Sequence, residues 1–385
     1  MTKILLNCPF PQPLFTSVDS LNLTSLVEYL CTNQPISEKI TFPRGTAIPD
    51  GRLDMCKQSL GAAGCSVITE ALEYNQTIVS LLLGTNGIGD IGASDVARLI
   101  ERNNHLEIVY LGCNAIAQTG IAKLAKVLKY NQSVTGLWLK RNPLGVDGAD
   151  SIAEMLRYNQ SIRTLDLVNT QIGEKGLTAI LKMLIETNRT VERLYLGGNQ
   201  IQSIHAFLLA DLLRHNPSIR SLFLNVNHLG DSGVKILATA LLENKTLREL
   251  GLASNGISAY GCQILLSAIQ DHISLSNLDL GYSPSTKVLG AEANLIGDLG
   301  VNAIANFIRN NQILFRLNLR GTGISDEGKA KILEALEQNK VLGYLILDGR
   351  VEPGIKLVLE RNRCLNPKDN LTESRDINLI RSVYR

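Results

Sequence analysis

A glycine motif at residues 87–92, with the sequence GIGDIG, is the first stretch of the chain that could do chemistry. Glycines with this spacing between a strand and a helix are typical of a dinucleotide-binding loop, where backbone N–H groups approach a pyrophosphate. The pair formed by Gly89 and Gly92, however, recurs as Gly145/Gly148, Gly173/Gly176, Gly230/Gly233 and Gly297/Gly300. A pair that recurs in this way indicates backbone packing, so we expect no cofactor.

Asparagines in Asn-x-Ser/Thr sequences could carry glycans if the protein were secreted. They are Asn75, Asn131, Asn159, Asn188 and Asn244, together with Asn22 and Asn370. The first five lie at the same position of a sequence repeat, which is described below. We therefore expect them to shape turns and helix ends instead of carrying sugars.

Metal ligands and nucleophiles show no comparable pattern. The five histidines have no metal-ligand spacing, and the seven cysteines include no Cys-x-x-Cys pair. An odd number of cysteines indicates reduced thiols in a cytosol. Cys113 lies on a predicted turn and could be a reactive thiol, but a structural role fits better. We expect no catalytic residue, no metal site and no enzymatic activity.

The repeat determines the architecture. Its pattern is N-x-[ST]-[IVL]-x-x-L-x-L-x-x-N-x-[IL]-G-x-x-G-x-x-x-[IL]-A-x-x-L. Units begin at Asn75, Asn103, Asn131, Asn159, Asn188, Asn216, Asn244, His272, Asn311 and Asn339, with spacings of 28, 28, 28, 29, 28, 28, 28, 39 and 28 residues. Such a period is typical of a solenoid, in which stacked units bury a continuous core.

Each unit has two halves with different hydrophobic periods. The first half alternates, as at residues 222–224, which predicts a short strand. The second half places apolar residues on one helix face, as at Val234, Leu237, Ala238 and Leu241. We expect the aspartates near the helix starts to cap those helices (Asp90, Asp147, Asp231, Asp298 and Asp326). We expect the asparagine after each helix to adopt a left-handed conformation.

We predict three regions along the chain. Residues 1–74 form a divergent N-terminal cap and first repeats, with strands at 18–23 and 40–42 and helices at 26–31 and 60–74. Residues 75–350 form the repeats, with an insertion near 281–295. Residues 351–385 form a C-terminal cap and tail, in which 354–362 close the array and 363–385 are a loose tail or a terminal cap.

The residue between the two leucines of each strand should face outward on the concave side. Reading this position gives an aromatic band, Tyr110, Trp138, Tyr195 and Phe223, interrupted by Asp166. Exposed aromatics and arginines dominate interface energetics. Polar residues of the later strands and the rim insertion complete the predicted partner-binding set, which is Tyr110, Trp138, Lys140, Asp166, Arg193, Tyr195, Phe223, Asp279, Tyr282, Lys287, Arg316, Asn318 and Arg320. We expect alanine at positions 138 and 195 to abolish partner capture without changing the melting temperature.

Composition narrows the partners and the compartment. Hydrophobic residues make up 45% of the chain, charged residues 19%, and the net charge of +2 does not favour nucleic acid. No apolar run is long enough for a membrane span, and the N-terminal apolar run is too short for a secretory signal. We expect a monomer that is cytoplasmic, or secreted without a cleavable signal into a host cytosol.

The motif LxLxxN followed by [IL]GxxGxxxLAxxL resembles the ribonuclease-inhibitor type of leucine-rich repeat over about residues 60–350. Similar arrays occur in NOD-like receptors, Ran GTPase-activating proteins and bacterial effectors. The resemblance implies an α/β leucine-rich-repeat solenoid, a horseshoe with parallel strands on the concave face and helices on the convex face. It implies a module that binds a partner protein through the concave face, for instance as a virulence effector in a host–pathogen interaction. The alternative is a GTPase activator of the Ran-activator type, although the acidic tail of those proteins is absent here.

Overall fold

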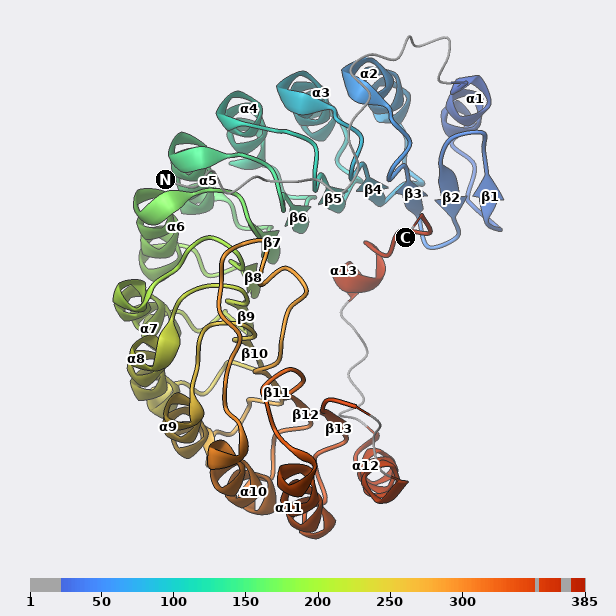
Figure 1. The fold of residues 1–385 in the computed structure, drawn as a ribbon. Helices are drawn as coiled ribbons and strands as arrows, with labels where there is room; N and C mark the ends of the chain where they lie inside the picture. The colour runs from blue at the N-terminus through green and yellow to red at the C-terminus, as the bar shows by residue number, and fades with distance from the viewer. Residues whose placement is uncertain (1–21, 350–352, 368–374, 385) are drawn as a thin grey trace. The chain divides into compact units, whose positions relative to one another are not determined.

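The computed structural model describes residues 22–349, 353–367 and 375–384 (Figure 1). The chain forms two compact units. The first unit holds residues 22–191 together with residues 375–384. The second unit holds residues 192–349 and 353–367. Most of the strand expected at 18–23 lies outside the described residues, and residues 22–23 are not in a strand.

The first unit begins with helix α1 (Thr24–Thr32) and a short antiparallel sheet. The strands of the first unit are β1 (Ile40–Thr41), β2 (Thr46–Ile48), β3 (Arg52–Asp54), β4 (Ser80–Leu82), β5 (Ile108–Tyr110), β6 (Gly136–Trp138) and β7 (Thr164–Asp166). From β3 onward neighbouring strands pair in parallel. The further helices are α2 (Gly61–Leu72), α3 (Gly89–Arg102), α4 (Gln118–Leu128), α5 (Gly145–Tyr158), α6 (Gly173–Glu186) and the four-residue α13 (Arg375–Asn378).

The second unit continues the alternation with parallel strands only. They are β8 (Arg193–Tyr195), β9 (Ser221–Phe223), β10 (Glu249–Gly251), β11 (Asn277–Asp279), β12 (Arg316–Asn318) and β13 (Tyr344–Ile346). The helices are η2 (Ser203–His205), α7 (Ala206–His215), α8 (Gly230–Glu243), α9 (Ala259–Ile269), η3 (Asp298–Gly300), α10 (Val301–Asn310), α11 (Asp326–Gln338) and α12 (Pro353–Leu365). Each unit is therefore an α/β solenoid, and the predicted fold class is confirmed. In each unit the strands line the concave side and the helices the convex side (Figure 1).

Alternation within each strand separates the core from the concave face. In β9, Leu222 and the following Leu224 are fully buried between sheet and helices, while Phe223 between them is partly exposed. The register aligns Leu194, Leu222 and Leu250, so equivalent leucines stack from one repeat to the next. This stacking gives the aliphatic core that a chain with few aromatic residues requires.

The asparagine that follows each helix ties neighbouring repeats together. Asn103 accepts backbone N–H groups of His105 and Leu106 at 2.8 and 2.9 Å, and its Nδ2 donates to the carbonyl of Leu72 at the end of α2 at 2.8 Å. Its φ of −104° is extended, so the expected left-handed conformation is wrong. The side-chain amide, and not the backbone conformation, explains why asparagine recurs here.

A second asparagine, the one in LxLxxN, forms a parallel ladder. Asn114 Oδ1 accepts the backbone N–H of Asn86, and Asn114 in turn donates its own N–H to Asn142 Oδ1, both at 2.9 Å. The amide Nδ2 of Asn114 donates to the carbonyl of Leu83 in the preceding repeat at 2.9 Å. These bonds satisfy backbone groups at turns that would otherwise be buried without partners.

Glycine and aspartate at the helix starts also link repeats. Gly89 has a φ of +59°, which favours glycine, and a Cβ on Gly92 would lie 2.5 Å from Cβ of Ile88. Asp90 Oδ1 accepts the N–H of Ala117 in the next repeat at 2.7 Å, while helix α3 has no side-chain cap. The expectation that such aspartates cap their own helices is therefore wrong for α3.

Candidate protein-interaction face

The residue between the two leucines of each repeat is the last residue of its strand, and these residues form one column along the concave face of each unit. Strand register aligns Leu82, Tyr110, Trp138 and Asp166 in the first unit. In the second unit it aligns Tyr195, Phe223, Gly251, Asp279, Asn318 and Ile346. The four aromatic residues predicted as one band thus divide into two pairs, one in each unit.

The aromatic pair of the first unit is covered by the C-terminal segment, residues 375–384. Trp138 is only 2% exposed and packs in one cluster with Ile108 and Leu379. Tyr110 and Ile380 pack against the same cluster. The expectation of an outward, accessible tryptophan is therefore wrong in this structure. The polar tail sequence concealed this contact, because one buried leucine among charged residues gives no periodic signal.

Charged residues beside Trp138 lie in the same covered region. Asp166 is 4% exposed, and burial raises its pKa to about 6. The positive charge of Lys140 and the backbone N–H of Val168, at 2.9 Å, act in the opposite direction. The Lys140 ammonium lies 5.3 Å from the centre of the Tyr110 ring. Lys140 and Asp166 thus partly neutralise each other on this face.

The aromatic pair of the second unit is stacked and partly exposed. The ring centres of Tyr195 and Phe223 lie 4.4 Å apart with an interplanar angle of 10°. The guanidinium of Arg193 lies 5.6 Å from the centre of the Phe223 ring, and its Nη2 lies 2.5 Å from Glu249 Oε1. Ser221 also donates to Glu249, at 2.7 Å. This ion pair fixes the arginine beside the aromatic stack.

A groove of about 250 Å³ continues from Phe223 toward the last strand of the second unit. The Arg316 guanidinium lies 4.2 Å from the centre of the Tyr344 ring. Asn318 donates to Asp279 at 2.7 Å. The lining residues are Phe223, Glu249, Leu250, Asn277, Leu278, Asp279, Arg316, Leu317, Asn318, Tyr344 and Ile346. The structure therefore brings together four predicted site residues, namely Phe223, Asp279, Arg316 and Asn318.

Two polar atoms of this groove lack partners. Asn277 Oδ1 and Arg316 Nε are shielded from solvent and have no hydrogen-bond partner among the residues that the structure describes. Unpaired buried polar atoms are costly, so such atoms mark places where a bound group could complete the bonding. Tyr344 is absent from the predicted set, although it is the first residue of its strand and its position could have been found from the register.

The rim insertion lies outside the groove lining. Thr286 Oγ1 lies 2.6 Å from Ser254 Oγ, and Gln200 donates to the carbonyl of Leu289 at 3.1 Å. These contacts hold the insertion against earlier repeats, although Lys287 is exposed. Tyr282, Lys287 and Arg320, which were predicted to bind a partner, do not line the groove.

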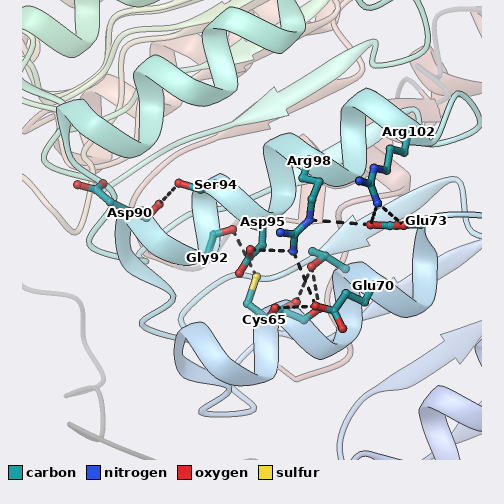
Figure 2. Close-up of polar contacts among 11 residues, drawn as sticks. Cys65, Glu70, Glu73, Asp90, Gly92, Ser94, Asp95, Arg98 and Arg102 are labelled. Carbon is teal, nitrogen blue, oxygen red and sulfur yellow. Dashed lines mark hydrogen bonds and ion pairs between the residues drawn. The ribbon is translucent and has the colours of Figure 1, made fainter.

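Charged side chains also cluster on helices α2 and α3 of the first unit (Figure 2). Arg98 Nη2 lies 3.0 Å from Asp95 and 3.8 Å from Glu70, and Arg98 Nε lies 3.9 Å from Glu73. Arg102 Nη1 lies 2.7 Å from Glu73. Both cations are paired within the cluster, so it is an ion-pair network of the helices and not an open binding site.

The buried thiols described in the structure and the search for metal-ligand groups and membrane-spanning helices in the same residues add no further site. Burial raises the pKa of the Cys56 and Cys262 thiols to about 12, and Cys113 is buried on its turn. Within residues 22–349, 353–367 and 375–384, no group of three His, Cys, Asp or Glu side chains could hold a metal ion. No helix in the described part of the chain is long and apolar enough to cross a bilayer.

Comparison with known proteins gives a sequence-family match. A family model described as Leucine Rich repeat matches residues 74–97, 102–125, 158–181 and 215–238. No curated protein matches the chain significantly. Among solved structures, actin-binding site 2 of leiomodin-1 is 17% identical with a TM-score of 0.27, over 60% of this chain and 96% of that chain. The tropomodulin C-terminal domain of Caenorhabditis elegans is 16% identical with a TM-score of 0.34, over 50% of this chain and 92% of that chain.

The matched segments coincide with the structural repeat. Residues 102–125, for example, contain the whole of β5 and most of α4. Residues 215–238 contain β9 and the first part of α8 in the second unit. Sequence match and strand–helix alternation have the same phase in both units, and the chain contains leucine-rich repeats in both.

Proposed function

We propose that the protein is a non-enzymatic module that binds a partner protein through its concave face, with the open site in the second unit. The groove over β9–β13 carries this proposal, because it brings partly exposed aromatic rings beside polar atoms without partners. Aromatic and arginine side chains supply most of the energy at protein interfaces. Arg193, Tyr195, Phe223 and Arg316 provide that chemistry.

The charges of the groove favour a polypeptide over a nucleic acid. Glu249 and Asp279 line it beside Arg316, so a phosphate backbone would meet carboxylates as well as the guanidinium. An extended segment of a partner could place an apolar side chain against Phe223 and Tyr344.

The experiment combines affinity purification from cytosol with substitutions on two surfaces. Tyr195→Ala and Arg316→Ala alter the concave face, whereas Tyr260→Ala removes an exposed tyrosine from helix α9 and serves as the matched control. Proteins captured by the wild type and by the control, but lost with the face variants, are identified by mass spectrometry. Affinity is then measured with the purified partner. We expect Tyr195→Ala to weaken it roughly 30-fold, as for an interface residue worth about 2 kcal/mol.

The result is interpreted only for variants whose circular dichroism matches that of the wild type. Equal capture and equal affinity with the face variants would contradict binding through the second unit. Loss of binding with Tyr260→Ala alone would move the site to the helices. Size-exclusion chromatography with light scattering tests the accompanying proposal that the free protein is a monomer.

Two narrower roles extend the proposal through the resemblance of the repeats. One is an effector acting in the cytosol of a host cell, and it is tested by whether the captured partner is a host protein. The other is activation of a Ran-type GTPase. Phosphate release by a panel of small GTPases, with and without the protein, decides it, and an unchanged rate removes that role.

A further inference from the structure

The C-terminal segment, residues 375–384, crosses the concave face of the first unit from β7 toward β2. Near its start, Thr164 of β7 donates to Asp376 at 3.0 Å, and Arg375 lies 2.5 Å from Glu107 beside β5. At its end, the hydroxyl of Tyr384 lies 2.7 Å from Thr46 Oγ1 in β2. The segment therefore follows the stacking direction of the repeats, as a ligand of a solenoid would.

Backbone atoms of the segment make most of the middle contacts. Ser80 donates to the carbonyl of Leu379 at 2.8 Å, and Arg52 donates to the carbonyl of Asn378 at 3.1 Å. Asp54 accepts the N–H of Val383 at 2.6 Å. Asp54 is fully buried, so part of its hydrogen bonding comes from the segment. Recognition of backbone atoms by fixed side chains is typical of peptide-binding surfaces.

The face has a fitted apolar position for one side chain of the segment. Leu379 is buried against Ile108 and Trp138, with Val79 and Tyr110 around them. Gly136 beside this position leaves room for the indole, because a Cβ there would lie 2.5 Å from Cζ3 of Trp138. The equivalent column of the second unit consists of Arg193, Ser221, Glu249, Asn277, Arg316 and Tyr344, in which Ser221 is the only small side chain.

Leu379 is the only residue of the segment that is fully buried within 375–384. Arg375, Asn378, Arg381 and Val383 are exposed. One anchored leucine and a small number of hydrogen bonds give a contact that can open without unfolding the repeats. The contact also covers Trp138 and Tyr110, two side chains of the kind that anchor protein partners.

We propose that the concave face of the first unit is a peptide-binding site occupied by the chain's own residues 375–384. The segment is a built-in ligand, and its departure opens the site to a partner segment of the same chemistry. Such a partner segment would carry an aliphatic residue at the position of Leu379, aliphatic residues on either side of it, as at Ile377 and Ile380, and a tyrosine near its end, as at Tyr384. The part that concerns a partner rests on the proposed function, whereas the docking of the segment does not.

Trp138 is the only tryptophan of the chain and reports directly on docking. The experiment uses the full-length protein with Leu379→Asp and measures the emission maximum and the quenching by acrylamide. The matched control is Leu357→Asp, the same substitution at an exposed position of helix α12. Loss of a buried leucine should weaken docking roughly 50-fold. We expect a red-shifted emission and several-fold stronger quenching for Leu379→Asp, and wild-type values for the control.

A synthetic peptide of residues 375–385, added to the Leu379→Asp protein, should restore the blue-shifted emission. The same peptide carrying aspartate at the leucine position should not restore it. Leu379→Ala is the second variant, with an intermediate shift expected, and circular dichroism verifies that the repeats remain folded. Wild-type emission and quenching in both variants would overturn the proposal, as would a peptide without effect. Emission that shifts on dilution together with dissociation of a dimer would assign the segment to a second copy and overturn docking within one chain.

None of these measurements requires a partner. If the segment docks but Tyr195→Ala leaves partner affinity unchanged, the proposed function fails and this inference stands. If the fluorescence result fails while Tyr195→Ala weakens binding, the inference fails and the proposed function stands.

Discussion

The concave faces of the two units have the same strand arrangement, but the first is covered by the C-terminal segment and the second is open. In the first unit Tyr110 and Trp138 lie beneath the C-terminal segment. The neighbouring column of the same face has small residues at Ser80 and Gly136. In the second unit Tyr195 and Phe223 stack in a partly exposed position beside a groove with unpaired polar atoms. The same aromatic pattern in a sequence can therefore specify a buried contact in one unit and an available surface in the other.

The difference arises in the neighbouring column of the same face, which lies two residues before the aromatic column along each strand. Gly136, two residues before Trp138 on the same face, and Ser80, in register with Ile108, leave space on either side of Ile108 for the segment. Arg193 and Glu249 fill the corresponding space in the second unit with an ion pair. The glycine beside Trp138 therefore leaves space for a covering segment that the Arg193–Glu249 ion pair takes up in the second unit.

Trp138→Ala should give the largest effect, because it removes a side chain that is nearly fully buried. We expect a loss of about 3 kcal/mol in the free energy of unfolding. This replaces the sequence-based expectation of an unchanged melting temperature. Chemical denaturation followed by circular dichroism measures the loss, with Tyr260→Ala as the exposed control. A loss below about 0.5 kcal/mol, the usual range for surface substitutions, would show that the first face is as open as the second.

Asp166→Asn should stabilise the protein at neutral pH. Burial raises the folded-state pKa of Asp166 to about 6, above its ordinary value of 3.8, so the charged carboxylate is disfavoured in the fold. The stability contributed by this group is greatest below pH 3.8 and falls as pH rises toward 6. We expect Asp166→Asn to raise the free energy of unfolding by about 2 kcal/mol at neutral pH. Lys140 loses its partner in this variant, which limits the gain.

The measurement for Asp166→Asn is denaturation of both proteins across this pH range. The advantage of the variant should disappear as pH falls below the ordinary pKa of aspartate. A constant advantage at every pH would assign the effect to packing instead of charge. The same measurement is repeated in the Leu379→Asp protein. There the concave face of the first unit is uncovered, so Asp166→Asn should raise the free energy of unfolding by less.

Arg316→Ala should have the smallest effect on stability, since it lies on the open face. Its contact with Tyr344 is a cation–π interaction at 4.2 Å, worth about 0.5–1 kcal/mol at an exposed site. We expect a comparable decrease in the free energy of unfolding, with Tyr344→Ala in the same assay as the partner variant. A decrease in the free energy of unfolding as large as that for Trp138→Ala would mean that the groove residues serve mainly to stabilise the fold.

The repeat architecture could be predicted from the sequence because the same hydrophobic pattern recurs in each repeat. The alternation around Leu222 and the helix face containing Leu237 are local signals, and their recurrence fixes parallel stacking. The details at the ends of helices were less accessible. Asn103 is selected for bonds made by its amide to another repeat, and Asp90 bonds to Ala117 and not to its own helix. Such interactions between repeats leave no trace in the pattern of one repeat.

The candidate site was predicted in part for the same reason. Strand phase is local, so the outward position of Phe223 and Asp279 could be read from it. The cover over Trp138 depends on Leu379, which is 241 residues later in the numbering (379 − 138) and lies in no repeat. The groove at Arg316 and Tyr344 depends on how long side chains of two neighbouring strands turn toward each other. Neither contact follows from periodicity.

The ladder of LxLxxN asparagines has a consequence for how this protein can change in length. Where this position is an asparagine, its amide serves the backbone of the preceding repeat, so a complete repeat can be gained or lost between two such asparagines with the same bonds restored. Asn86 and Asn114 are 28 residues apart, whereas Asn255 reaches the next ladder position at Asn294, 39 residues later. The extra residues were accommodated between two ladder positions that still meet. Gene duplication would therefore extend such an array in whole steps, while shorter insertions survive only where they loop out and return to the next asparagine.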